Sequence, residues 1–272
     1  MTARVETLKL SMEHRAFLKK RRLRRFAVAV VQLAFLAMFF ATWELAADIR
    51  LIDPFIFSQP SRMLKTAHAM AMDGSIFYHI WITLSETVAG FILGTLLGSA
   101  FAIMLWWNEF IKDVAEPYLV VLNSLPKTAL APILIVWIGA NRGSIIFTAV
   151  LTGVIVTTIT VLTGFLSCDP EKLKLIRTFS GTKKQELTKA LLPSSIPVII
   201  SALKINVGLS FVGVIVGEFL VAKAGLGYLI VYGSQIFKLD WVMMSIIILA
   251  AIAAFMYKII VEIEKKFVKW GE

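Results

Sequence analysis

Long apolar runs separated by short polar connections dominate the chain. The runs cover residues 26–47, 80–107, 118–138, 144–166, 196–221 and 241–257. A helix that crosses the hydrocarbon of a bilayer needs about 20 mostly apolar residues, whereas the strands of a membrane barrel alternate in polarity. The pattern therefore predicts an all-α, polytopic membrane protein with about six transmembrane helices. Pro126, Lys127 and Pro132 interrupt the third of these runs.

Composition and charge support a membrane protein. The 272 residues are 58% hydrophobic and 17% charged, with a net charge of +10, whereas soluble domains are about half apolar and a quarter charged. Such a charge can indicate a nucleic-acid partner, but its distribution does not. The connections expected on the cytosolic side hold twenty Lys and Arg residues and the opposite ones hold six. By the positive-inside rule both chain ends are predicted to be cytosolic. Because the basic residues lie where membrane orientation requires them, no nucleic-acid partner is expected.

The basic cluster KKRRLRR at residues 19–25 precedes the first apolar run. It is interpreted mainly as an orientation anchor near anionic lipid. A secretory signal is the alternative, but the 22-residue run that follows is too long and lacks a clear cleavage site. The single cysteine, Cys168, excludes an intrachain disulfide.

The long outer connection contains SQPSRMLKTAHAM from Ser58. Pro60 suits a helix start, and the apolar residues that follow have helical spacing. This segment is expected to form a helix that lies flat on the membrane surface or simply packs on the protein surface.

The inside connection, residues 167–195, is long and basic. Asp169 and Pro170 suit a helix start, Gly181 breaks the pattern, and Thr182 with Gln185 forms a capping-box arrangement. Two prolines, Pro193 and Pro197, are expected to end the second helix and open the fifth span. The prediction is a rigid cytosolic protrusion of two short helices around a glycine.

This protrusion resembles the cytosolic "EAA" loop of permease subunits of ATP-binding-cassette (ABC) importers. In that pattern a Glu-Ala-Ala group is followed by Gly, a spacer and Leu-Pro, which Gly181, TKKQELTKAL and Leu192-Pro193 match. Leu175, Ile176 and Arg177 stand where Glu-Ala-Ala would fall, so the carboxylate of the pattern is absent.

Other segments resemble the nitrate, sulfonate and taurine branch of these permeases. They are NSLPKTALAP from Asn123 with Trp137-Ile138-Gly139, VGEFLVAKAGLGYLI from Val216, and TLSETVAGFILGTLLG from Thr83. Glu86 occupies a position that is often Arg in this branch. The resemblance covers residues 58–260, taken as the permease core. Residues 26–57 are taken as the first span with its outer connection, 1–25 as a basic cytosolic tail, and 261–272 as a second tail.

The resemblance implies a type I permease of a binding-protein-dependent importer in a prokaryotic cell membrane. Two permease copies, expected to be identical, would form the pore, two ATPase subunits would supply ATP and Mg²⁺ chemistry, and an extracytoplasmic binding protein would deliver the solute. The residues implied to contact the ATPase are Phe179, Ser180, Gly181, Thr182, Lys183, Gln185, Glu186, Leu192 and Pro193.

The chain itself is not expected to be an enzyme or to hold a cofactor or metal. It lacks the phosphate-binding GxxxxGK[ST] loop. Its three histidines, His14, His68 and His79, are scattered outside the runs.

Ionisable groups inside spans are functional candidates because they are costly there. The candidates for the translocation path are Glu86, Lys127, Thr152 and Glu218. For each a structural role is the alternative, and Thr152 belongs to a threonine-rich fourth run whose hydroxyls can bond their own backbone. Glu44 and Lys204 are close enough to the ends of their runs to reach the interface.

Gly90, Gly94 and Gly98 repeat every four positions in the second run. This spacing permits close approach of two helices, either within the chain or between subunits.

The predicted function is import of a small solute, either a nitrate-, sulfonate- or taurine-like anion or a molecule like a thiamine precursor. The rival is a secondary transporter or channel driven by an ion gradient, for which Glu86 and Glu218 would be the buried ionisable groups.

Overall fold

The computed structural model describes residues 12–267, with side chains described from 17 to 265. The described residues form helices and turns without strands, as the apolar runs predict. The chain divides into two compact units, residues 1–62 and 63–272. The predicted tails fall partly, and the His14 side chain entirely, outside the described residues.

The first unit contains one long helix. Helix α1 (Met12–Asp48) includes the predicted first span and continues through the basic cluster without a break. A short helix α2 (Pro54–Phe57) and the start of α3 (Pro60–Met72) follow. The carboxylate of Glu44 accepts hydrogen bonds from Gln59 Nε2 (2.7 Å) and from the backbone N–H of Ser61 (2.9 Å). Glu44 therefore caps the first turn of α3.

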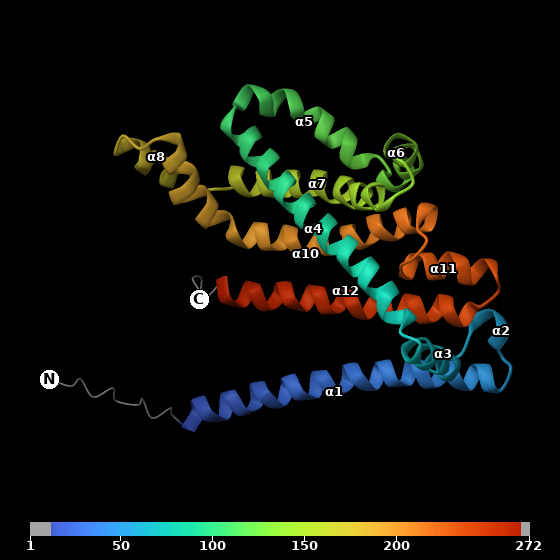
Figure 1. Cartoon of the computed structure of the whole chain (residues 1–272). Helices are drawn as coiled ribbons and strands as arrows, with labels where there is room; N and C mark the ends of the chain where they lie inside the picture. Colours follow the sequence, from blue (N-terminus) through green and yellow to red (C-terminus); the bar gives the residue numbers. More distant parts are fainter. Residues whose placement is uncertain (1–11, 268–272) are drawn as a thin grey trace. The chain divides into compact units, whose positions relative to one another are not determined.

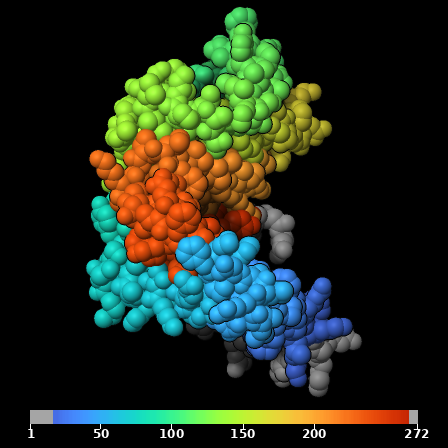
Figure 2. Space-filling model, turned by 90° about the vertical axis from the view of Figure 1, so that its right-hand side faces the viewer, coloured from blue at the N-terminus to red at the C-terminus, as the bar shows by residue number. Residues whose placement is uncertain are grey.

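The second unit contains the remaining helices. They are α4 (Ser75–Trp107), α5 (Glu109–Ser124), the 3₁₀ turn η1 (Lys127–Leu130), α6 (Ala131–Ile138), α7 (Arg142–Leu166), α8 (Pro170–Thr178), α9 (Lys183–Gln185), the π-helical segment η2 (Glu186–Leu191), α10 (Leu192–Val221), α11 (Leu226–Gln235) and α12 (Leu239–Phe267). Helices α4, α7 and α10 pack against one another, and α12 packs on α10 and α11. Figure 1 shows α4 crossing the α7–α10 pair diagonally, and Figure 2 shows the surface of α7 beside that of α10 and α11.

The glycines of α4 lie on its face toward α7. A Cβ added at Gly90 would lie 2.5 Å from Ala149 Cβ, and one added at Gly98 would lie 2.6 Å from Thr157 Cβ. Only glycine allows the two helices to come this close. The glycine repeat therefore serves packing within the chain, which was the first of its two interpretations.

Five helices are long and apolar enough to cross a membrane among the described residues, and one bent pair makes a sixth. The bent pair is the third run, where α5 and the η1–α6 segment meet at 86°. At the bend, Lys127 Nζ donates to the backbone oxygen of Asn123 at 3.0 Å. Lys127 thus satisfies a carbonyl that the break leaves without a helical partner.

Several boundaries differ from the sequence prediction. Helix α4 begins at Ser75 rather than at residue 80, and α5 begins at Glu109 rather than at residue 118. Pro193 and Pro197 do not end a helix, because α9, η2 and α10 continue from residue 183 to 221. The wider π-helical turn of η2 comes directly before Pro193, which lies in the first turn of α10 and needs no hydrogen-bond donor there. Helix α12 extends past the predicted end of the sixth span to Phe267, because Met256 and Ile260 still pack against the α10 side.

Candidate functional site

The predicted protrusion lies at the end of α7 and α10 that is opposite to α11 (Figure 1). We call residues 169–193 the elbow. Its first helix, α8, begins as predicted, because the Asp169 side chain accepts from the backbone N–H of Glu171 at 2.9 Å and Pro170 occupies the first helical position. Its second half is anchored in the protein, since Leu187 and Leu191 are buried against Phe165 of α7.

The turn between the two halves has a Schellman geometry. The N–H of Ser180 donates to the oxygen of Arg177 at 2.9 Å, and the N–H of Gly181 donates to the oxygen of Ile176 at 2.9 Å. Ser180, not Gly181, adopts the left-handed conformation, with φ of 56°. Gly181 is required for space instead, because an added Cβ would meet the Ile176 side chain and lie 2.7 Å from the Ile176 oxygen.

The second half of the elbow starts with the predicted capping box. The N–H of Gln185 donates to Thr182 Oγ1 at 3.3 Å, and the N–H of Thr182 donates to Gln185 Oε1 at 2.7 Å. Lys183 Nζ donates to the Trp107 carbonyl at 2.7 Å and lies over the Trp106 ring. Lys183 therefore ties the elbow to the C-terminal end of α4, where a cation is favourable.

A two-bond ion pair joins the two halves of the elbow. Arg177 Nε and Nη2 donate to the two carboxylate oxygens of Glu186 at 2.7 and 3.0 Å. The Glu186 side chain is 6% exposed and that of Arg177 is 65% exposed. The hydrogen bonds that Arg177 donates to the Glu186 carboxylate raise the pKa of the Arg177 guanidinium above its ordinary value, so Arg177 stays charged. The elbow thus has a carboxylate partner for its first helix, although the Glu of the EAA pattern is missing.

The exposed tip of the elbow carries a large apolar side chain. Phe179 is 80% exposed and directly precedes the turn. Lys184 and Gln185, in the second half of the elbow, are also exposed. Leu192 is half-buried at the start of α10, and Pro193 is exposed. Exposed aromatic residues on a fixed protrusion are frequent anchors of protein interfaces.

A charge exchange tests whether the Arg177–Glu186 pair sets the angle of the elbow. Arg177→Glu and Glu186→Arg each place two like charges side by side. Each is expected to reduce strongly the solute-dependent ATP hydrolysis that the resemblance to importer permeases implies for an assembled transporter. The double variant restores the pair in the opposite direction and is expected to recover most of the activity. If the double variant is as inactive as the single ones, Arg177 or Glu186 acts through a contact of its own.

A second polar cluster lies at the opposite end of the α4–α7–α10 core and holds the start of α11. Glu218 is 1% exposed. One of its oxygens accepts from Thr83 Oγ1 at 2.7 Å and the other from the Gly227 N–H at 2.6 Å. Thr83 Oγ1 accepts in turn from the N–H of Leu226 at 2.7 Å. Side chains of α4 and α10 thereby satisfy the first N–H groups of α11, which no helical carbonyl can reach.

Glu86 belongs to the same end of α4. Arg142 Nε, at the start of α7, donates to Glu86 Oε1 at 2.8 Å, and Arg142 Nη2 donates to Ser85 Oγ at 2.8 Å. Glu86 is 1% exposed and Arg142 57%. The second carboxylate oxygen of Glu86 is buried and makes no hydrogen bond with a described residue. Its charge is therefore balanced mainly by one partly exposed guanidinium.

An aromatic stack completes this end. The rings of His79 and Tyr228 are stacked at 6.0 Å, and those of Tyr228 and Tyr232 at 5.4 Å. His79 Nδ1 accepts from the N–H of Gly225 at 3.0 Å. Gly225 has a φ of 121°, and an added Cβ would collide with the Glu218 carboxylate. The loop before α11 therefore depends on glycine for both its conformation and its approach to Glu218.

The other polar residues inside the spans make contacts between or within helices. Thr152 Oγ1 donates to the oxygens of Ala149 (2.7 Å) and of Leu209 on α10 (3.1 Å). Asn206 Nδ2 donates to Thr95 Oγ1 at 2.6 Å. Other threonines of α7 bond their own backbone, as the alternative interpretation predicted; they are Thr148, Thr158, Thr160 and Thr163.

The structure thus brings Glu86 and Glu218 to one end of the core and leaves Thr152 and Lys127 apart from them. Lys204, near the opposite end, pairs with Glu264 of α12 at 2.6 Å. The sequence prediction missed Arg142, Thr83 and the His79–Gly225 bond. In the sequence Arg142 lies in a short connection between two apolar runs, and nothing in local spacing connects it to Glu86.

The arrangement of helices is shared with a solved structure. A solved structure of the MetNI methionine ABC transporter matches 72% of this chain and 98% of the matched chain, with a TM-score of 0.64 at 16% identity. A family model for binding-protein-dependent transport system inner membrane components matches residues 90–266. The chain belongs to this family.

Named relatives include permease proteins of sulfonate and formylaminopyrimidine transport systems. The chain is similar to the aliphatic sulfonates transport permease protein SsuC of Bacillus subtilis, with 24% identity over 86% of this chain and 85% of the relative. It is also similar to the formylaminopyrimidine transport permease protein ThiX of Halalkalibacterium halodurans, with 31% identity over 71% and 77% of the two chains. The resemblance deduced from the sequence motifs is confirmed, and this chain is a permease subunit of an ABC importer.

Proposed function

We propose that this permease carries a small solute into the cell when separate ATPase subunits, bound at the elbow, hydrolyse ATP with Mg²⁺. Two copies of the chain form the pore, and an extracytoplasmic binding protein delivers the solute. The elbow and both chain ends lie in the cytosol, which the excess of Lys and Arg in these connections supports.

The geometry of the elbow carries the proposal. A segment that transmits motion from a bound partner must be fixed to the protein at one end and exposed at the other. Leu187 and Leu191 anchor the second half of the elbow in the core, and the Arg177–Glu186 pair holds the two halves together. Phe179 is exposed at the turn between them, where a partner can contact it. A displacement of the tip would therefore reach α10, which continues from the elbow without a break.

The residues proposed to form the ATPase contact are those expected from the motif, but the structure gives them different roles from one another. Phe179 is the proposed anchor, and Gln185 is also exposed. Gly181, Thr182 and Glu186 build the turn, and Ser180 supplies its left-handed residue. Lys183 joins the elbow to α4, while Leu192 and Pro193 begin α10.

The proposed path of the solute runs beside the bend of the third span and beside the polar cluster that contains Glu86 and Glu218. Lys127 is partly exposed at the bend, and Arg142 keeps part of its guanidinium exposed next to Glu86. Glu218 and Thr152 are buried, and we propose that they hold the helices that surround the path. The relatives named for sulfonates and formylaminopyrimidine support a small anion or a thiamine-precursor-like solute.

Affinity purification of the tagged permease from its own host tests the partners. We expect an ATPase subunit to be recovered with it, and uptake into proteoliposomes to require ATP inside together with the binding protein outside. Uptake by the permease alone, driven by an ion gradient, would contradict the proposal. The variant Phe179→Ala is expected to weaken recovery of the ATPase. Phe237, at the other end of the core, is also exposed, at 68%, and Phe237→Ala serves as the control.

A further inference from the structure

A groove lies between the two halves of the elbow, and we call it the elbow groove. Its walls are formed by α8 and by the segment from η2 to α10. The residues that line these walls include Lys172, Leu175, Ile176, Lys189, Ala190 and Pro193. The volume of the elbow groove is about 470 Å³, within the range of about 300–1,000 Å³ that is usual for small-molecule sites.

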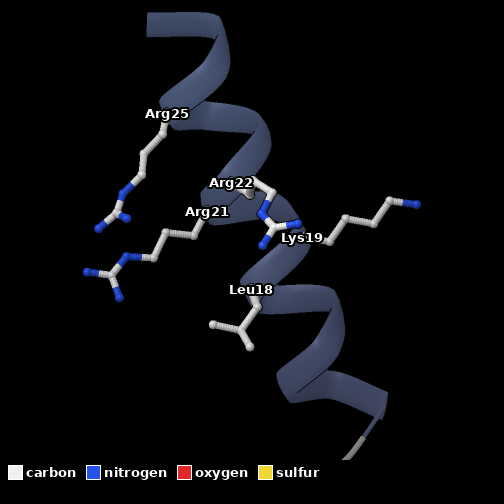
Figure 3. Close-up of a pocket in the computed structure, with 5 residues that line it drawn as sticks. All are labelled: Leu18, Lys19, Arg21, Arg22 and Arg25. Carbon is white, nitrogen blue, oxygen red and sulfur yellow. The ribbon is translucent and has the colours of Figure 1, made fainter. Parts of the chain in front are cut away.

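A second cavity of similar volume, beside α1, lacks two such walls. It is lined by Leu18 and four cations of α1 alone. Figure 3 shows Arg21 and Arg25 extending to one side of the helix and Lys19 to the other. Exposed side chains of this kind change rotamer rapidly, so they do not give the cavity a fixed shape. The elbow groove differs because its walls are two helical segments in contact with each other.

The base of the elbow groove is apolar. Ala190 is buried and Ile176 is half-buried, and both belong to the cluster around Phe165 and Leu191. Leu175, on the same wall as Ile176, is 60% exposed. Because the elbow is proposed to lie in the cytosol, lipid does not account for this apolar surface. It is suited to the apolar part of a ligand.

Two lysines flank this base from opposite walls. Lys172 and Lys189 are both exposed, and no carboxylate lines the elbow groove among the described residues. Glu186, three positions before Lys189, is already held by Arg177. Glu171 is adjacent to Lys172 in α8, and adjacent helical residues do not face each other. The elbow groove therefore combines an apolar base with two positive charges that no residue lining it balances.

We propose that the elbow groove binds a small organic anion with a short apolar chain, which reaches it from the cytosol. Lys172 and Lys189 bind the charged group, and the chain lies on Ile176 and Ala190. The volume suits a small molecule better than a protein surface, since a stable protein interface buries about 800 Å² on each partner. The ligand would connect the same two segments that the Arg177–Glu186 pair joins nearer the turn. The proposal rests on the cytosolic location of the elbow, but not on its contact with an ATPase.

Lysine acetylation of the full-length permease in phosphatidylcholine nanodiscs, followed by mass spectrometry, tests the proposal. Pentane-1-sulfonate is the probe and is expected to slow acetylation of Lys172 and Lys189 severalfold. Lys174 and Lys184 are also exposed but do not line the elbow groove, and their acetylation should not change. Methanesulfonate has the charge without the chain. Because each buried methylene raises affinity about fourfold, methanesulfonate should need a concentration at least about tenfold higher.

A matched pair of variants on α8 shows whether the two lysines act together. Lys172→Gln is expected to remove the protection of Lys189, whereas Lys174→Gln should retain it. Acetylation of Lys172 and Lys189 that the sulfonate leaves unchanged, or slows no more than that of Lys174, would overturn the proposal.

Two further arms identify other occupants. Protection of both groove lysines without the sulfonate in phosphatidylglycerol nanodiscs, but not in phosphatidylcholine, would overturn the proposal in favour of a lipid headgroup. Protection by an added ATPase subunit, with no effect of the sulfonate on the permease alone, would overturn it in favour of a partner segment. Neither result depends on ATP hydrolysis, so failure of the proposed coupling function would not be mistaken for failure of the anion site.

Discussion

Replacing Gly181 by aspartate is expected to abolish ATP-coupled uptake while the permease still inserts into the membrane. A Cβ at this position meets the Ile176 side chain and approaches the Ile176 oxygen to 2.7 Å. Relieving such a contact costs roughly 1–3 kcal/mol and displaces the last turn of α8. The aspartate also brings a negative charge to the C-terminal end of that helix, where the helix dipole disfavours it.

The measurement is ATP hydrolysis by the assembled transporter and uptake of the solute that its binding protein carries, at equal amounts of inserted permease. Ser180→Gly is the matched control. Ser180 has a φ of 56°. Glycine removes the cost of about 1–2 kcal/mol that a side chain has in this left-handed conformation, which offsets the entropy that glycine loses on folding, so the turn is expected to stay stable. Undiminished uptake by the Gly181→Asp variant would show that the turn does not transmit the ATPase motion.

Replacing Glu218 by alanine is expected to destabilise the folded permease by about 3 kcal/mol, because two hydrogen bonds to a buried carboxylate are lost. The N–H of Gly227 and the hydroxyl of Thr83 would lose their acceptor. The first turn of α11 and its contact with α4 should loosen together. Thermal unfolding in detergent, followed on purified protein, measures the effect.

The variant Glu218→Gln removes the negative charge but can keep the hydrogen bonds, so it distinguishes the effects of the two. The amide oxygen can accept from Gly227, and the amide NH₂ can donate to Thr83 Oγ1, so most of the stability should remain. If the glutamine variant is stable but transports poorly, the negative charge itself serves transport. If the alanine variant unfolds at the wild-type temperature, Glu218 does not clamp α11 as the geometry indicates.

Local patterns were sufficient to predict the helices and the turn of the elbow. Apolar runs of membrane length define spans because the hydrocarbon accepts few other backbone structures. The Asp169 cap, the capping box of Thr182 and Gln185, and the break at Gly181 involve residues only a few positions apart, so they can be recognised in the sequence. The prediction failed at Pro197, because a proline inside a continuous helix depends on how neighbouring turns adjust.

The polar contacts could not be predicted in the same way. Glu86 and Arg142 are 56 positions apart and Thr83 and Glu218 are 135 apart. Each pair meets only because α4, α7 and α10 pack with a particular register. The sequence motif showed that the carboxylate of the Glu-Ala-Ala group is absent, but not that Glu186, on the other side of the turn, pairs with Arg177 of the first helix.

The sequence by itself determined the membrane class, the approximate position of the spans and the elbow, since these follow from hydrophobicity and short-range spacing. The transporter family was indicated by the resemblance of the elbow and of other segments to known permeases. Only the tertiary structure decided which buried charges are paired, which face the α4 glycines cover, and that Glu218 holds α11. Those properties depend on the distance between helices that are remote in sequence, which neither composition nor periodicity contains.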